Sequence, residues 1–452
     1  MGDDSRALVP RDEGLVFFIT GRDSMLITQA PKGTQDVLPG ESGRWQDVEA
    51  KMRETCHLAG YREVRTPVFE HTELFLRSVG DTTDVVQKEM YTFLDKGGRS
   101  ITLKPEGTAG VARAFLEAHL EAGALPMKMY YISCPVFRYE KPQSGRLREH
   151  HQLGIEVFGA KDASCDAEGI RLALDVLEKC GITGLKVSIN SIGCPDCRAA
   201  YQEKLREFLR PLLPKLCETC RDRFERNPMR ILDCKVPSCQ AELTDAPDML
   251  GSLDADCQAH FEQLQKSLSA LGVAFSVDPR IVRGLDYYTR TVFEIITQTE
   301  NGPLTVCGGG RYDGLVKQLG GPELPGFGFG MGVERVLMVQ DMKGVKPPEQ
   351  PVVDAFVATL GDVRAEAMKL VRSLREQGVR ADMDHAARSL KAQFKYADRL
   401  GAPLLLIVGG DELARGTVKL RDMRKSAESE IPLNEIVEAV KGKLRKEGAD
   451  IC

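Results

Sequence analysis

Polar side chains converge on one face of a predicted β-hairpin that spans residues 129–159. Neighbouring residues of a strand point to opposite faces of a sheet, so Gln152 and Glu156 share a face of the returning arm. Arg138, near the end of the first arm, can reach the same patch. Gly154 lies between the two acceptors and leaves room for a ligand against the backbone. We interpret the hairpin as the floor of a ligand site, although a solvated sheet edge would show the same alternation.

The loop of this hairpin is rich in charge. It contains Lys141, Arg146, Arg148 and Glu149. Its cations can meet a phosphate group, because guanidinium groups bind phosphate oxygens through charge-assisted hydrogen bonds.

A second polar group is predicted where a strand at 101–105 gives way to a helix. Glu106 stands just ahead of the helix, and Thr108 is the expected N-cap. A glutamate beside free backbone amides is placed to hold an ammonium group. A helix start that merely favours negative charge explains the same residues.

A third group lies in the stretch RGLDYYTR, at a turn between two apolar arms. Arg283, Asp286, Tyr287, Tyr288 and Arg290 bring two cations, a carboxylate and two phenols into a short β segment. Such a concentration of polar groups in a β region is typical of a binding pocket.

The stretch GFGFGMGVERVL carries the most specific local pattern. Glycine occupies every even position from Gly326 to Gly332, so one strand face lacks side chains and could carry a flat ring such as adenine. Arg335 follows at a predicted helix start, where it can cover the ring or reach a phosphate. No GxxxxGK[ST] occurs, and no GxGxxG opens a helix after a strand. A nucleotide would therefore bind to an antiparallel sheet with arginines.

Two CxxC pairs separated by a helical segment suggest a metal site. Cys194 and Cys197 form the first pair, and Cys217 and Cys220 form the second. The spacing is that of a tetrahedral zinc site with four thiolates and a structural role. Free buried thiols are the alternative, and the spacing does not decide between the two.

The order of predicted elements indicates several domains. We expect an α/β (α+β) fold with these parts: an N-terminal extension at 1–28, either disordered or upstream of a start at Met25; a catalytic core at 29–190 and 266–345 with an antiparallel sheet flanked by helices; a mostly helical cysteine-rich insertion at 191–265; and a compact α/β domain at 351–452.

Composition fits a globular intracellular protein. Charged residues make up 28% of the chain, the net charge is −5, and no apolar run reaches the roughly 18 residues of a membrane helix. The thirteen cysteines are odd in number and scattered, which argues against a disulfide scaffold. We therefore expect a cytoplasmic protein without a membrane segment. In the last domain a basic stripe of Lys391, Lys395 and Arg399 could meet a nucleic-acid backbone or be a solvated helix face.

Several of these stretches resemble a known family. RYEKPQSGRLREHHQLGIE and GFGFGMGVERVL resemble two signatures of class II aminoacyl-tRNA synthetases, and KGTQDVLP, RGLDYYTRTVFE and TVCGGGRYDGL resemble stretches particular to the bacterial-type histidyl-tRNA synthetases. The resemblance implies a class II antiparallel sheet, a C-terminal anticodon-binding domain, a homodimer, and the use of ATP, Mg²⁺, L-histidine and tRNA(His).

The resemblance also implies residue roles. Arg138 and Arg283 would be catalytic and neutralise the α-phosphate. The histidine site would comprise Glu106, Gly107, Thr108, Arg138, Gln152, Glu156, Arg283, Tyr287 and Tyr288, with Glu106, Gln152 and Glu156 at the amino group. The ATP site would comprise Arg138, Glu140, Arg146, Gly330 and Arg335. The tRNA would meet Arg148, Lys391, Lys395 and Arg399.

A non-catalytic relative is the main alternative. The histidine-sensing regulatory subunit of ATP phosphoribosyltransferase shares the fold, but it typically lacks the C-terminal domain and has eroded arginines. This chain keeps Arg138, Arg283, Arg335 and residues 351–452, which favours the synthetase.

Overall fold

The computed structural model describes residues 8–10, 15–17, 29–80, 83–142, 145–232, 234, 236–281, 284–300, 302–346 and 351–446. Contacts divide the chain into two compact units, Met1–Lys346 and Pro347–Cys452, and each is described by itself. Arg283 lies outside the described residues.

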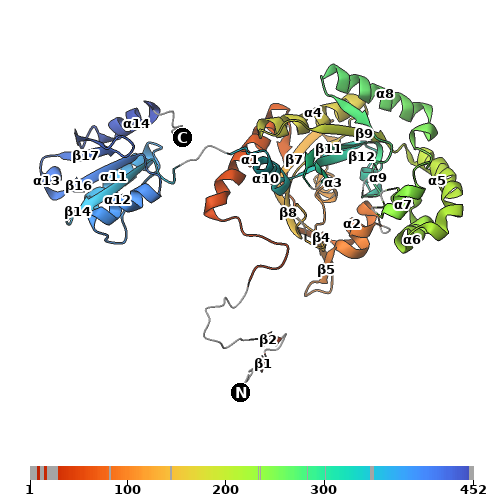
Figure 1. The fold of residues 1–452 in the computed structure, drawn as a ribbon, viewed down its shortest axis with the longest axis horizontal. Coiled ribbons are helices and arrows are strands. Elements are labelled where there is room, and N and C mark those ends of the chain that lie inside the picture. Colours follow the sequence, from red (N-terminus) through yellow and green to blue (C-terminus); the bar gives the residue numbers. More distant parts are fainter. Residues whose placement is uncertain are drawn as a thin grey trace. The chain divides into compact units, whose positions relative to one another are not determined.

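An eight-stranded sheet organises the first unit (Figure 1). Its order is β10 (Phe275–Val277), β9 (Lys186–Ser191), β11 (Thr289–Thr299), β12 (Gly302–Arg311), β13 (Gly326–Gly332), β8 (Glu149–Phe158), β7 (Met127–Phe137) and β3 (Arg62–Glu63). The central pairs are antiparallel, and only the two edge strands, β10 and β3, run parallel to their neighbours. The predicted hairpin is therefore β7 and β8, and the glycine-rich strand is β13, which pairs with β8.

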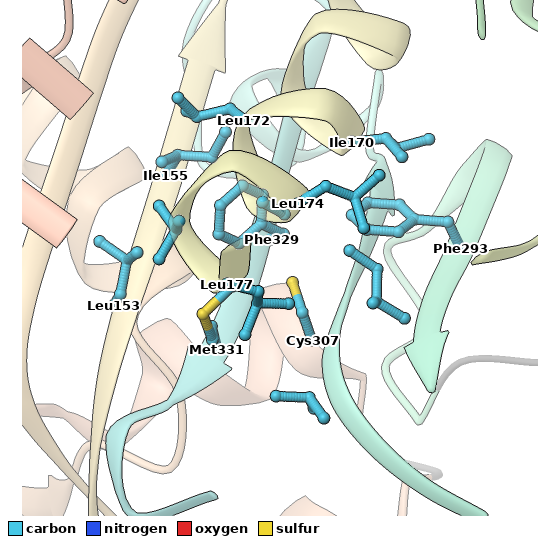
Figure 2. Close-up of a cluster of buried hydrophobic side chains, with 14 of the residues drawn as sticks. Leu153, Ile155, Ile170, Leu172, Leu174, Leu177, Phe293, Cys307, Phe329 and Met331 are labelled. Atoms are coloured by element: carbon cyan, nitrogen blue, oxygen red, sulfur yellow. The ribbon is translucent and has the colours of Figure 1, made fainter. Parts of the chain in front are cut away.

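One face of this sheet is sealed by a hydrophobic core (Figure 2). Helix α4 (Ala163–Lys179) lies across the strands, and its leucines meet side chains that point down from β8, β13, β12 and β11. The strand residues are the odd-numbered Leu153, Ile155, Phe293, Cys307, Phe329 and Met331. Because strands alternate, the even-numbered residues of β8 and β13 are left for the opposite face.

Further elements surround the sheet. Helices α1 (Pro39–Leu58) and α10 (Val333–Met342) contact each other, and α1 also contacts α4. A three-stranded sheet in the order β4 (Phe69–His71), β6 (Ser100–Leu103) and β5 (Tyr91–Leu94) leads into α3 (Thr108–Glu117). The remaining short elements are α2 (Thr72–Val79), η1 (Val85–Glu89), η2 (Leu120–Ala122) and α9 (Leu315–Gln318).

The segment between β9 and β10 is helical. Most of it gathers beside one end of the sheet, whereas its last helix packs against α4 and shares the core on the sheet face (Figure 1). It contains α5 (Pro195–Leu209), η3 (Arg210–Lys215), α6 (Glu218–Arg226), η4 (Pro228–Ile231), α7 (Pro237–Glu242), η5 (Leu250–Ser252) and α8 (Ala255–Ala270). Tyr201, Leu205 and Leu209 of α5 are buried at helical spacing, and the segment between the first two CxxC pairs is helical, as the sequence predicted.

The second unit is built on a five-stranded mixed sheet. Its order is β15 (Ala381–Met383), β14 (Ala355–Leu360), β16 (Leu404–Gly409), β17 (Thr417–Asp422) and β18 (Ala427–Pro432). Helices α11 (Arg364–Glu376) and α14 (Ile436–Lys446) share one hydrophobic core with the sheet, and α12 (Leu390–Arg399) belongs to a second core on the other face. A short helix α13 (Gly410–Ala414) joins β16 to β17.

The N-terminal extension contains two short strands, β1 (Leu8–Pro10) and β2 (Leu15–Phe17), which pair antiparallel. The sequence pattern predicted no element there, and most of residues 1–28 lie outside the described part of the chain. No helix among the described residues is long and apolar enough to cross a membrane.

Candidate active site

Glu106 is buried where β6 gives way to α3, and its carboxylate caps that helix. The backbone N–H groups of Thr108 and Ala109 donate to its two oxygens at 2.7 and 2.8 Å. Thr108 is therefore not the N-cap that the sequence predicted: it is the first residue of α3, Gly107 is the N-cap residue, and the Glu106 side chain accepts from the free N–H groups. Burial raises the pKa of the Glu106 carboxyl, and the two N–H donors offset part of that rise.

Glu156 is fully buried on β8 and accepts hydrogen bonds from three hydroxyl groups. The Thr108 hydroxyl donates to Oε1 at 2.8 Å, the Tyr131 hydroxyl donates to the same oxygen at 3.3 Å, and Tyr312 donates to Oε2. Burial raises the pKa of Glu156 to about 8, and the negative charge of Glu106 adds to the rise. Thr108 thus links the two carboxyl groups, one through its amide and one through its hydroxyl.

Aromatic rings wall this carboxyl pair. Tyr287, Tyr288 and Tyr312 pack against one another, with ring centroids 4.8 to 6.4 Å apart, and the Tyr287 hydroxyl donates to Glu106 at 3.4 Å. All three are buried. Two carboxyl groups and several phenols are thus buried together, a combination of side chains that suits a small ligand carrying both a cation and a flat ring.

Arg138 follows the end of β7 and lies close enough to the carboxyl pair for its charge to act on Glu106. Its Nε donates to the Pro105 carbonyl at 2.9 Å, and its Nη1 lies 3.8 Å from Glu89 Oε2. Its positive charge helps to hold down the pKa of Glu106 and lowers that of His150. Arg138 is therefore within electrostatic reach of both the carboxyl pocket and the β8 surface.

A second cation, Arg335, stands at the first turn of α10. Its Nε donates to the Gly145 carbonyl at 2.9 Å and its Nη1 to the Thr305 carbonyl at 2.7 Å. Burial lowers the pKa of His150 to about 3, and the charges of Arg138 and Arg335 act in the same direction. The imidazole is thus neutral at physiological pH and sits in the field of two guanidinium groups.

The glycines of β13 divide into a covered and an open pair. A Cβ at Gly326 would lie 2.3 Å from the Tyr312 ring, and one at Gly328 would lie 2.3 Å from the Ile155 carbonyl oxygen. At Gly330 and Gly332 the nearest atoms, from Gln152 and Arg335, are 3.6 Å away. The strand face that the sequence predicted could carry a flat ring is therefore available only in part, because Tyr312 and Glu156 fill half of it. The open half lies between Gln152 and Arg335.

The charged loop of the hairpin makes mostly local contacts. Arg146 is exposed, with its Nη1 3.9 Å from Glu140 Oε2. Arg148 stacks over the Tyr139 ring at 4.4 Å and donates to the Glu140 carbonyl at 3.1 Å. In the second unit Lys391, Lys395 and Arg399 are exposed along α12, while Ala397 is buried beneath them.

The two CxxC pairs do not form one site. Cys217 and Cys220 lie with Cys234 and Cys239, which we call the four-cysteine group, and Cys194 and Cys197 lie with Cys257 and Asp254, which we call the cysteine–aspartate group. The prediction of one set made of Cys194, Cys197, Cys217 and Cys220 is therefore wrong. Spacing along the chain pairs neighbouring thiols correctly, but it does not show which later residues the helices bring back.

Sequence reasoning missed Tyr131, His150 and Tyr312. Tyr312 belongs to TVCGGGRYDGL, and the three glycines just ahead of it in the sequence were a usable signal for a residue near a ligand. Gly107 and Gly154 have no room for a side chain because the Tyr131 ring lies over both, at 2.3 and 2.1 Å from a Cβ there. The prediction that Gly154 leaves room for a ligand against the backbone is therefore wrong, since the Tyr131 ring occupies that space.

Comparisons with known proteins match this architecture over most of the chain. The histidyl-tRNA synthetase family profile matches residues 33–336, and an anticodon-binding domain profile matches residues 354–443. Histidine–tRNA ligases of Caldanaerobacter subterraneus and Alkaliphilus oremlandii are 53% and 55% identical, over 92% and 91% of this chain and 100% and 98% of theirs. The crystal structure of apo histidyl-tRNA synthetase from S. aureus superposes with a TM-score of 0.79 at 36% identity, covering 92% of this chain and 100% of that one.

The fold and site together define a class II aminoacyl-tRNA synthetase, with an antiparallel catalytic sheet followed by an anticodon-binding domain. Within that class, the chain belongs to the histidyl-tRNA synthetase family. The predicted fold class is confirmed. The regulatory-subunit alternative is not favoured, because the curated ligases match nearly the whole chain at about half identity.

Proposed function

We propose that this protein activates L-histidine with ATP to give histidyl-adenylate and then transfers the histidyl group to the 3′ end of tRNA(His). One observation carries the proposal. The buried carboxyl groups of Glu106 and Glu156 lie beside the positive charges of Arg138 and Arg335 on an antiparallel sheet. A chain of this family needs both, one for the amino acid and one for the nucleotide.

The histidine pocket is the buried one. Glu106, Gln152 and Glu156 receive the ammonium group, with Gly107 and Thr108 beside them, and Tyr287 and Tyr288 line the imidazole. Tyr131 and Tyr312 hold the Glu156 carboxyl in place through their hydroxyls. A hydrophobic amino acid would leave these buried polar groups without partners, which is the strongest means of rejection available to a binding site.

The nucleotide lies on the open half of the glycine face. Gly330 leaves space for the ring, Arg335 covers it, and Arg138 and Arg146 meet the phosphates, with Glu140 beside them. Glu89 and Glu140 fit a magnesium ion, because carboxylate oxygens are the ligands it prefers and because Glu89 Oε2 is buried without a hydrogen-bond partner among the described residues. When bound, Mg²⁺ would neutralise phosphate charge.

The chemistry needs no nucleophilic side chain. A carboxylate oxygen of histidine attacks the α-phosphorus and pyrophosphate leaves with the electrons of the broken P–O bond. Negative charge grows on the equatorial phosphate oxygens, and Arg138 with Arg283 neutralises it. In the second step a ribose hydroxyl of the tRNA attacks the histidyl carbonyl, and AMP leaves.

The remaining partners follow from surfaces. The second unit carries the anticodon contacts, and Lys391, Lys395, Arg399 and Arg148 meet the tRNA backbone. Phe69, Phe93 and Leu94 are exposed on the three-stranded sheet β4–β6–β5, and such a patch on a globular unit is typical of an interface. We assign it to the homodimer contact, which light scattering of the purified protein tests directly.

Two further assignments complete the proposal. An enzyme that charges tRNA works where translation occurs, so its location is cytoplasmic. The cysteine-rich insertion holds zinc in a structural role, away from the residues that bind histidine and ATP.

ATP–pyrophosphate exchange tests the function. We expect exchange that depends on histidine, followed by charging of tRNA(His) with the same preparation. Exchange with a different amino acid only, or histidine binding without exchange, would overturn the proposal; the second result is the behaviour of a regulatory subunit.

A further inference from the structure

The insertion contains two separate sets of metal-ligand side chains. In the four-cysteine group and in the cysteine–aspartate group, the four ligand atoms lie within 4.8 Å of one another, and the two sets share no residue. We propose that each group binds one zinc ion, so that the chain carries one site of four thiolates and one site of three thiolates and a carboxylate. This inference deepens the proposal of a structural zinc by fixing the number of ions and the ligands of each.

The four-cysteine group has the dimensions of a closed tetrahedral site. Zn–S bonds of about 2.3 Å place the sulfurs of such a site about 3.8 Å apart, and the Sγ atoms of Cys217 and Cys234 are 4.0 Å apart. Cys220, Cys234 and Cys239 are buried. Four thiolates leave no open position for water, so the site is structural and not catalytic.

Three separate elements deliver these thiols. Cys217 caps α6 and Cys220 lies in its first turn, Cys234 follows η4, and Cys239 lies in α7. The backbone N–H of Cys217 donates to Cys239 Sγ at 3.2 Å. Donors of this kind around a metal site fix the ligands and favour the thiolate form. Convergence from three elements is more than a CxxC turn alone produces.

The cysteine–aspartate group repeats one local geometry at two helix starts. Cys194 is the N-cap of α5 with Cys197 three residues on, and Asp254 is the N-cap of α8 with Cys257 three residues on. Both helices thus direct their positive ends at the same point, which favours anionic ligands there. An aspartate has taken the place that a cysteine holds in the first half of the site.

Asp254 contacts the thiols of this group in the way that a protonated, metal-free site would require. Its Oδ1 accepts from the Cys257 N–H at 2.7 Å, while its Oδ2 accepts from the thiols of Cys194 and Cys197, both at 3.1 Å. Binding of Zn²⁺ would displace these two thiol protons and the proton of Cys257, and the released protons go to solvent.

The position of this second site gives it a mechanical role. Cys194 is at the entrance of the insertion and Asp254 near its exit, 60 residues apart in sequence. The backbone of Gly193 packs tightly against Cys197, since a Cβ at position 193 would lie 2.5 Å from Cys197 Cβ. A zinc ion at this point joins the two ends of the insertion to each other, where β9 leads out of the catalytic sheet.

Other buried cysteines lie in the hydrophobic core, outside both groups. Cys56, Cys165, Cys180 and Cys307 are buried among apolar side chains and belong to neither group. They supply a matched control, because removal of one of them takes a buried thiol away without touching either site.

Metal analysis of the full-length protein, purified without chelator under reducing conditions, tests the proposal. We expect two zinc ions per chain, and an X-ray absorption edge that reports mostly sulfur with a minor oxygen component. Cys239→Ser and Asp254→Asn each lose one ion, whereas Cys180→Ala keeps both. Asp254→Asn retains an N-cap for α8, so its loss of zinc is not a loss of the helix start. Asp254→Cys, which puts a thiolate in place of the carboxylate, binds two ions, in contrast to Asp254→Asn.

Several outcomes would overturn the inference. Less than half a zinc ion per chain would sink both sites, as would disulfides within the groups in the freshly purified protein or a metal edge dominated by nitrogen and oxygen. If the parent binds one zinc ion per chain, and that ion is lost in Cys239→Ser but kept in Asp254→Asn, the site in the cysteine–aspartate group alone is ruled out. Histidine-dependent exchange is measured on the same samples, so failure of the metal proposal is distinguishable from failure of the proposed function. The absorption edge of the unmodified protein decides the ligand type even where a variant does not fold.

Discussion

At the scale of single residues, Arg138 is the group on which adenylate formation should depend most. Its side chain is half-buried and donates to the Pro105 carbonyl, and its charge acts on the pKa values of both Glu106 and His150. We expect Arg138→Ala to lower histidine-dependent exchange by about a hundredfold or more. Arg138→Lys should recover only part of this, because an ammonium group lacks the guanidinium fork.

Arg171→Ala is the matched control for that measurement. Arg171 forms its ion pairs with Asp175 and Glu178 along α4, across the sheet from the site. Exposed pairs of this kind contribute little, so exchange should stay within a factor of about two. An Arg138→Ala enzyme with exchange within about threefold of the parent would show that the charge is not used.

Ionisation of the Glu156 carboxyl is expected to lower the free energy of unfolding as the pH rises. Its folded pKa of about 8 exceeds the ordinary value of 4.5 because the carboxyl is buried, so the folded state binds the proton more tightly than the unfolded state. The free energy of unfolding therefore falls between about pH 4.5 and pH 8. Glu156→Gln removes this fall and should raise stability relative to the parent by roughly 2–5 kcal/mol more at about pH 8 than at about pH 5.

Urea unfolding of both proteins at the two pH values measures this difference. The same variant should lose histidine-dependent exchange by at least about a hundredfold, since the substrate ammonium group loses an acceptor that can give up its proton and become charged when the ammonium group binds. A stability difference that is equal at the two pH values would mean that the Glu156 carboxyl titrates normally.

At the scale of elements, β13 separates glycines that the fold needs from glycines that a ligand needs. Gly328→Ala would place a methyl group 2.3 Å from a β8 carbonyl oxygen, so we expect a loss of stability of about 1–3 kcal/mol from the forced backbone shift. Gly330→Ala meets only Gln152 at 3.6 Å and should fold normally. Its methyl group occupies the nucleotide floor, and the KM for ATP should rise about tenfold or more.

Thermal unfolding and exchange at varied ATP concentration distinguish the two effects. Gly43→Ala in α1 is the control, because no atom lies within 4 Å of the added methyl group and alanine is the better helix former. Normal KM for ATP in Gly330→Ala would remove the open half of the glycine face from the nucleotide site.

The β7–β8 hairpin shows how far the sequence could predict the site. Strand parity placed Gln152 and Glu156 on one face correctly, because β8 is regular. It could not place Tyr131, since β7 has a bulge between Tyr131 and Cys134, with Ser133 at a φ of +48°. Odd-numbered residues face the ligand before the bulge and even-numbered residues after it. Nothing in ISCPVF marks where that change falls.

The same limit applies to the insertion and to the helix start at α3. Local rules found the CxxC pairs and a capped helix, but long-range packing decided that Cys217 meets Cys239 and that the Thr108 hydroxyl turns to Glu156. Fold class and the sheet were accessible from the sequence because many residues carry those signals together, whereas each of these contacts rests on one side chain.

At the scale of the whole molecule, charging of tRNA should be separable from activation of histidine. The residues proposed for histidine and ATP all belong to the first unit, whereas α12 belongs to the second. Lys391, Lys395 and Arg399 share one exposed side of α12, where phosphate contacts would make binding depend on salt. Activation needs no tRNA, so changes on this helix should leave the first step alone.

Lys391→Glu combined with Lys395→Glu is the direct test. We expect exchange to be unchanged, while the KM for tRNA(His) in aminoacylation rises about tenfold and its dependence on salt becomes shallower, because two phosphate contacts are lost. Arg364→Glu with Lys369→Glu makes the same change in net charge on α11, whose core lies on the other face of the second sheet. If both pairs raise the KM equally, the effect is one of overall charge and α12 is a solvated face. If only the α12 pair does so, the basic stripe is where the second unit holds the nucleic acid.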